Sequence, residues 1–149
     1  MMRASTSIDI AASAHEIYAL AEDVSRWPEL LPHYRYVSIL RESPRERLAV
    51  MAARRGRIGV RWTAVERLDP GTPRIEFTHV SGWTAGMEVA WRFDPFPGGT
   101  RVIIEHELEF RLVPLIGEWI GRRIIGDYFI QAIASKTLAC FKELAEART

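Results

Sequence analysis

The chain has 149 residues, of which 48% are hydrophobic and 26% are charged, and its formal net charge at pH 7 is +1. This length allows one hydrophobic core of useful size, so we expect a single domain over residues 1–149. The small net charge provides no overall field that would attract nucleic acid or a membrane surface. The single cysteine, Cys140, excludes a disulfide framework.

The composition also bears on where the protein works. No apolar run approaches the roughly 18 residues of a membrane span, and residues 1–10 lack the apolar stretch of a signal peptide. We therefore expect a cytoplasmic protein without a transmembrane segment. Of the 20 basic residues 18 are arginine, and asparagine is absent. This bias is typical of bacterial genomes rich in G and C.

The first elements are a short strand and two short helices. Residues 6–10 have the alternation of a strand. Ser13 and Glu16 have the spacing of a capping box, which predicts a helix that begins after Ser13. A second short helix is expected at residues 27–30, where a proline occupies an early position that helices tolerate.

A run of strands comes next. Their turns are short and rich in Gly, Pro, Ser and Asp, and short turns make successive strands antiparallel neighbours. The expected strands are 34–41, 47–55, 58–68, 74–80, 83–93 and 100–112.

The last third of the chain, from Pro114 to Ala147, contains no residue that stops a helix. Its apolar residues recur at spacings of three and four: Ile130, Ile133, Ala134, Thr137, Leu138, Cys140, Phe141 and Leu144. A bent, seven-stranded antiparallel sheet is the available cover for this stripe, so we expect an α+β fold with a sheet wrapped around one long C-terminal helix. Three glycines weaken the helix before Ile130, and this part is expected to form the wall or lid of a cavity.

Alternation along the strands assigns the inward side chains. In 100–112 the apolar face includes His106, and in 74–80 it includes Phe77 and His79. In 58–68 two assignments stay open. Either Trp62 and Glu66 point inward, or a bulge turns Arg67 inward.

Several motifs resemble one family. Residues 17–34, which contain Trp-Pro-Glu-Leu-Leu-Pro at 27–32, resemble the START-like helix-grip (SRPBCC) superfamily, in particular its polyketide cyclase/dehydrase and coenzyme Q-binding branch. Residues 62–70, 91–95 and 99–102 carry the same likeness. In the aromatase/cyclases of this branch, the resemblance implies a cavity with a tyrosine, an arginine and tryptophan walls. Here those residues would be Tyr34, Arg67, Trp27 and Trp91.

These observations support two hypotheses of function. The first is a binding protein for a hydrophobic, ring-containing small molecule such as a quinone, a polyketide or a lipid. Its ligand contacts would be Trp27, Tyr34, Trp62, Phe77, His79, Met87, Trp91, His106, Ile120 and Ile124. The alternative is an aromatase/cyclase that performs aldol cyclisation and dehydration of a poly-β-keto chain, with Arg67, Tyr34 and His106 as catalytic residues. For each histidine, a core residue with a satisfied hydrogen bond is the competing interpretation.

No motif indicates a metal or a cofactor, and no standard catalytic signature is present. Cys140 is interpreted as a core residue. The arginines between 41 and 61 form either a solvated strand surface or a docking patch for an acidic protein: Arg41, Arg45, Arg47, Arg54, Arg55, Arg57 and Arg61. Nucleic acid is not expected, because no aromatic stacking platform accompanies them. Monomer and homodimer both stay open.

Overall fold

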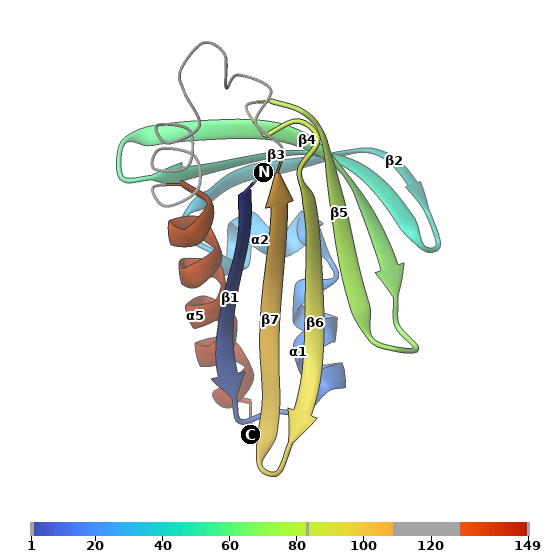
Figure 1. Ribbon diagram of the computed structural model, residues 1–149, viewed down its shortest axis with the longest axis vertical. Helices are drawn as coiled ribbons and strands as arrows, with labels where there is room; N and C mark the ends of the chain where they lie inside the picture. Colours follow the sequence, from blue (N-terminus) through green and yellow to red (C-terminus); the bar gives the residue numbers. More distant parts are fainter. Residues whose placement is uncertain (1, 83, 109–128, 149) are drawn as a thin grey trace.

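The computed structural model describes residues 2–82, 84–108 and 129–148. Within them the chain forms one sheet with helices on one side of it (Figure 1). The elements are β1 (Met2–Ile10), α1 (Ala14–Ala21), the 3-10 helix η1 (Val24–Arg26), α2 (Trp27–Leu30), β2 (Tyr34–Ser43), β3 (Glu46–Arg55), β4 (Ile58–Asp69), β5 (Arg74–Ser81), β6 (Glu88–Phe96), β7 (Gly99–Leu108) and α5 (Ala132–Glu146).

The sheet of the described chain has seven strands in the order β1-β7-β6-β5-β4-β3-β2, and each neighbouring pair is antiparallel. Only β1 leaves the sequential hairpin order, because it pairs with β7 across the whole chain. The β2–β4 half bends away from the β1–β7–β6 half, and α1 and α5 lie together on one side of the sheet (Figure 1). The predicted α+β architecture of a bent sheet around a C-terminal helix is confirmed.

Local sequence features explain the two α-helices, α1 and α2, that precede β2. The Ser13 hydroxyl accepts a hydrogen bond from the Glu16 amide at 3.2 Å, as the capping box predicts. The Trp27 indole N–H donates to the Ala21 carbonyl at 3.0 Å, which ties α2 to the end of α1. Buried indole N–H groups need such a partner, so Trp27 fixes the position of α2 under the sheet.

The C-terminal helix buries the predicted stripe. Ala134, Thr137, Leu138 and Phe141 are buried, and Phe141 is fully enclosed. Residues 114–128 of the predicted helix, including the expected lid, lie outside the described residues. None of the described helices is both long and apolar enough to cross a membrane.

One predicted strand is wrong at its start. The expected strand 83–93 begins at Glu88, because residues 84–87 form a turn closed by a Met87 N–H to Thr84 carbonyl bond of 2.9 Å. Gly86 has φ +93° in this turn, a conformation that glycine adopts without steric cost. The turn could not be predicted from the sequence, because the residues around it include aromatic and β-branched types that are typical of strands.

Gly99 provides a prediction about the closure of the sheet. A Cβ atom at this position would lie 2.2 Å from the Ile10 carbonyl oxygen, at the end of the β1–β7 pair. We expect Gly99→Ala to lower the free energy of unfolding by about 1–3 kcal/mol, because backbone must move to relieve the contact. Gly71→Ala is the control, since its Cβ would meet Asp69 Oδ1 at an ordinary 3.6 Å. Urea denaturation of both variants measures the difference, and equal losses would contradict the expectation.

Candidate functional site

A cavity of about 390 Å³ lies between the sheet and the N-terminal part of α5. This volume falls within the usual range of small-molecule sites, roughly 300–1,000 Å³. All eight of the predicted ligand-contacting residues that the structure describes line it: Trp27, Tyr34, Trp62, Phe77, His79, Met87, Trp91 and His106. Ile120 and Ile124 lie outside the described residues. That these side chains contact a ligand stays a prediction.

Trp27 is the centre of the aromatic wall. Its ring centroid lies 5.0 Å from that of Tyr34, 5.9 Å from that of Phe77 and 5.8 Å from that of Trp91. Edge-to-face and tilted pairs of this kind add to the stability gained by burial. Four elements, α2, β2, β5 and β6, therefore meet at one ring, which gives the cavity a rigid apolar floor.

His79 is held in place from two sides. Its Nδ1 lies 2.7 Å from Thr84 Oγ1, and its ring stacks on Trp62 with centroids 5.4 Å apart and an interplanar angle of 6°. Burial, with a smaller contribution from His106, lowers the pKa of His79 to about 3. The imidazole is thus neutral at physiological pH.

His106 lies on β7 with Ala4 and Val89 as its register neighbours, and only 7% of it is exposed. Its Nδ1 is buried and has no hydrogen-bond partner among the described residues. Burial lowers the pKa of His106 to about 4, so the ring is neutral near pH 7. A neutral imidazole can accept a proton. His106 therefore differs from a core histidine with a satisfied hydrogen bond, because its Nδ1 has no partner among the described residues.

Tyr34 begins β2 and is also buried at the cavity wall. Burial raises the pKa of its phenol well above the ordinary value of 10. The hydroxyl therefore stays protonated and can donate a hydrogen bond. Together with the two histidines it gives the apolar cavity a small set of neutral polar groups.

The structure does not bring Arg67 to this cavity. The bulge that disturbs the β4–β5 pairing adds a residue to β5, at Val80, and leaves the alternation of β4 unbroken. Arg67 consequently points to the outer face, where its Nη2 donates to Thr78 Oγ1 at 2.8 Å. Glu66 takes the inward position with 1% exposure, so the assignment that places Trp62 and Glu66 inward is correct.

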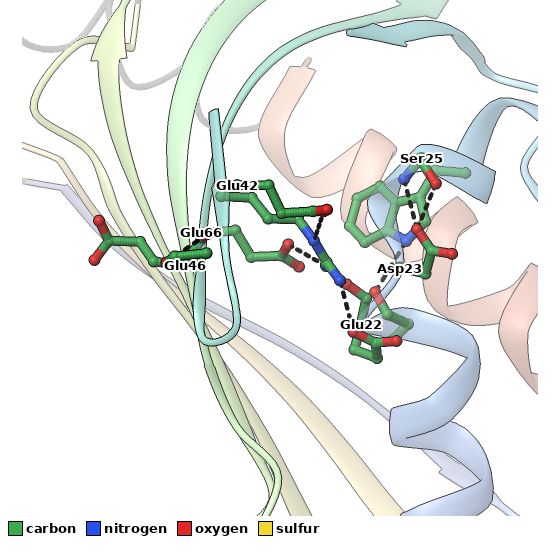
Figure 2. Close-up of polar contacts among 10 residues, drawn as sticks. Glu22, Asp23, Ser25, Glu42, Glu46 and Glu66 are labelled. Carbon is green, nitrogen blue, oxygen red and sulfur yellow. Dashed lines mark hydrogen bonds and ion pairs between the residues drawn. The ribbon is translucent and has the colours of Figure 1, made fainter. Parts of the chain in front are cut away.

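An ion-pair network around Glu66 was not predicted. Arg47 Nη1 donates to Glu66 Oε1 at 2.9 Å, and the same guanidinium pairs with Glu22 and Glu42. Figure 2 shows the carboxylates of Glu22, Glu42 and Glu66 converging, while Glu46 points away. The sequence placed Arg47 on either a solvated surface or a docking patch, and both placements are wrong for this residue, because its side chain is 15% exposed and ion-paired. The network lies outside the residues that line the cavity.

His33 is a second buried group that sequence reasoning missed. Its Nε2 lies 2.8 Å from Thr137 Oγ1, whose hydroxyl donates to the Ile133 carbonyl at 2.7 Å. The His33 Nε2–H therefore donates to Thr137, which ties the start of β2 to α5 across the cavity's edge. The position after Pro32 had no alternation that could place this side chain inward.

Within residues 2–82, 84–108 and 129–148, no group of three or more His, Cys, Asp and Glu side chains is arranged to hold a metal ion. The lining combines bulky aromatic rings with neutral hydrogen-bonding groups. Such a site suits an apolar molecule that carries carbonyl or hydroxyl oxygens.

The family model described as "Polyketide cyclase / dehydrase and lipid transport" matches residues 10–133. The chain therefore belongs to this family, and the resemblance identified from the Trp-Pro motif is confirmed. A related protein is the granaticin polyketide synthase bifunctional cyclase/dehydratase of Streptomyces violaceoruber, 30% identical over 110 residues, which are 70% of this chain and 33% of that protein. The chain thus spans about a third of the length of this relative.

Two solved structures show the same fold. The Zhui aromatase/cyclase from Streptomyces sp. R1128 matches with a TM-score of 0.86 at 18% identity, over 99% of this chain and 94% of that one. A START superfamily protein from Mycobacterium smegmatis matches with a TM-score of 0.71 at 16% identity, over 99% of both chains. The helix-grip architecture expected from the sequence is confirmed by these likenesses.

Proposed function

We propose that this protein is a cyclase/dehydratase that folds a poly-β-keto chain in its cavity and promotes aldol cyclisation followed by loss of water. The observation that carries the proposal is an aromatic cavity of about 390 Å³ whose lining includes His106, His79 and Tyr34 as neutral polar residues. The family description and the names of the two Streptomyces proteins support the same chemistry.

The cavity residues can perform both steps. Neutral His106 accepts a proton from the methylene between two carbonyls, and the resulting enolate carbon attacks a second carbonyl, forming the new C–C bond. Tyr34 donates a hydrogen bond to the oxygen on which charge develops. The His106 imidazolium returns its proton to the aldol oxygen. In the second step His106 removes another α-proton and then protonates the departing hydroxyl, so that water leaves and a C=C bond remains.

Much of the rate enhancement would come from confinement. Apolar rings force a flexible chain into few conformations and exclude water, which turns a disfavoured ring closure into an oriented one. The neutral histidines suit this role, because a charged group would be costly in such a wall.

The direct test is cyclisation of a poly-β-keto chain supplied as a small soluble thioester, with products followed by mass spectrometry. We expect wild-type protein to form a cyclised, dehydrated product, and Tyr34→Phe to reduce kcat by about 10²–10³-fold through loss of one donor. Arg67→Ala is the matched control and is expected to retain activity, because Arg67 lies on the outer face. No product with wild type across a series of chain lengths would refute the proposal.

A second candidate is binding of a hydrophobic, ring-containing molecule, such as a quinone, a polyketide or a lipid, without chemistry. The observation that favours it is that Arg61, which is exposed, is the only charged residue among the described cavity lining. Titration of tryptophan fluorescence with a quinone distinguishes the two. Saturable binding together with absent turnover would favour a carrier.

A further inference from the structure

The arginines on one half of the sheet are neutralised within the chain. Arg3 pairs with Glu107 at 3.5 Å, and Arg101 pairs with Asp9 at 2.8 Å. On β6, Arg92 contacts Glu105 and Asp94. Single surface pairs contribute little stability. Because the pairs recur over β1, β6 and β7, however, the positive charges there are balanced and no strong local electrostatic field results.

The other half of the sheet differs. Arg35 on β2, Arg54 on β3, Arg57 in the β3–β4 turn and Arg61 on β4 are exposed, and none has an ion-pair partner in the part of the chain that the structure describes. We call these four residues the arginine surface. From residue 54 to residue 65 the sequence contains no Asp or Glu. The first carboxylate beyond this stretch is Glu66, which is buried and bound to Arg47.

The fold brings these charges together. Arg54 lies opposite Gly59 in the β3–β4 register, and a Cβ at Gly59 would lie 3.4 Å from the Arg35 Nη1 atom. The Arg35 side chain therefore reaches from β2 across β3 to β4, over the strand position that has no side chain. Arg61 follows two residues later on the same face of β4.

Like charges held this close repel each other, and no described acidic side chain offsets them. An anionic partner would remove that repulsion. The planar guanidinium fork forms two parallel bonds with a carboxylate, so a surface made of arginine alone suits acidic side chains. A membrane-binding surface would add several bulky apolar residues, whereas Ile58, the first residue of β4, is the only large apolar side chain among residues 54–59.

The arginine surface also borders the cavity. Gly59 and Arg61 belong to its lining, together with Ile130 and Ala134 at the start of the C-terminal helix. Figure 1 shows the β3–β4 hairpin extending to the same end of the molecule as the beginning of α5. A partner seated on the arginines would therefore lie beside this part of the cavity lining.

We propose that the arginine surface is the docking site for an acidic protein that delivers the ligand to the cavity. The delivery role rests on the proposed function, whereas the docking itself does not. Electrostatic docking of this kind accelerates encounter and weakens as salt is added.

The test is a binding titration with an acidic acyl carrier protein that carries a short acyl chain on its phosphopantetheine arm. The test variant is Arg35→Gln/Arg54→Gln/Arg57→Gln. The control variant, Arg3→Gln/Arg92→Gln/Arg101→Gln, removes the same number of positive charges from the opposite half of the sheet. Thermal denaturation confirms that both variants are folded before titration.

We expect wild type to bind with a Kd that rises with salt, and the test variant to bind about tenfold more weakly, as the loss of three surface ion pairs predicts. The control variant should stay within about threefold of wild type. No binding by wild type at low salt, equal weakening of both variants, or binding only to phosphatidylglycerol vesicles would each overturn the proposal. Turnover of the small thioester is measured separately, so failure of catalysis and failure of docking are distinguishable.

Discussion

Replacement of Arg47 by methionine is expected to lower the free energy of unfolding by about 3–5 kcal/mol, the usual cost of removing one partner of a buried ion pair. Glu66 has 1% exposure, and its Oε1 depends on the Arg47 guanidinium at 2.9 Å. Its Oε2 already has no hydrogen-bond partner among the described residues. Without Arg47, the carboxyl group would stay buried with neither charge compensation nor a donor. Urea denaturation at pH 9, above the pKa of about 8 that burial gives Glu66, measures the loss while the carboxyl group of the wild type is ionised.

Two further variants separate this effect from simple loss of packing. Arg74→Met removes an exposed pair with Glu76 and should cost at most about 1 kcal/mol. The double variant Arg47→Met/Glu66→Leu should recover most of the lost stability, because no buried charge remains. A double variant no more stable than Arg47→Met would show that the guanidinium mainly fills space.

The same network predicts a dependence of stability on pH. Burial raises the pKa of Glu66 to about 8, although the hydrogen bond and charge of Arg47 lower it, and Glu22 and Asp23 add to the rise. A raised folded-state pKa means that the folded protein holds a proton that the unfolded chain releases near pH 4.5. This contribution is full below about pH 4.5 and is lost as the pH rises through 8.

Glu66→Gln isolates that contribution, because glutamine keeps an oxygen for Arg47 and cannot titrate. The stability of wild type relative to Glu66→Gln should fall between pH 5 and pH 9. The difference between the two proteins cancels the titration of the buried histidines, whose lowered pKa values make stability rise with pH in the acid range. A flat difference curve would contradict a proton held by Glu66.

The elements that could be predicted are those with regular neighbours. The apolar face of β7 was assigned inward together with His106. Its residues Val102, Ile104 and His106 are buried, because β7 pairs without register shifts on both sides. Alternation is reliable where both ladders are regular. The long apolar stripe of α5 was equally clear, since only helical spacing explains it.

Arg67 could not be placed, because its direction depends on the neighbouring strand. The irregularity at Val80 belongs to β5, and nothing within residues 58–69 indicates it. The position of a bulge depends on how strongly the sheet bends, and this bending is a property of the whole fold. The partnership of Arg47 with Glu66 follows from the β3–β4 register, which places the two residues directly opposite each other, 19 residues apart in sequence. It was hidden because the inward direction of Glu66 was left open.

His106→Gln is expected to reduce kcat for cyclisation by about 10²–10⁴-fold, the usual contribution of a general acid–base group. Glutamine has similar size and polarity but cannot exchange a proton. His15→Gln is the matched control, because His15 is not among the residues that line the cavity and should leave the rate unchanged. A comparable loss in both variants would contradict a specific role for His106.

The pH profile gives the sharper readout for this residue. Neutral imidazole is the active base, and burial lowers the pKa of His106 to about 4. Wild-type kcat/KM should therefore stay level from pH 8 down to about pH 5 and fall as the pH approaches 4, rather than near the ordinary histidine value of 6.5. The residual activity of His106→Gln should lack this acid limb. A wild-type midpoint near 6.5 would mean that the reacting base is solvated, and the buried His106 would then be excluded from that role.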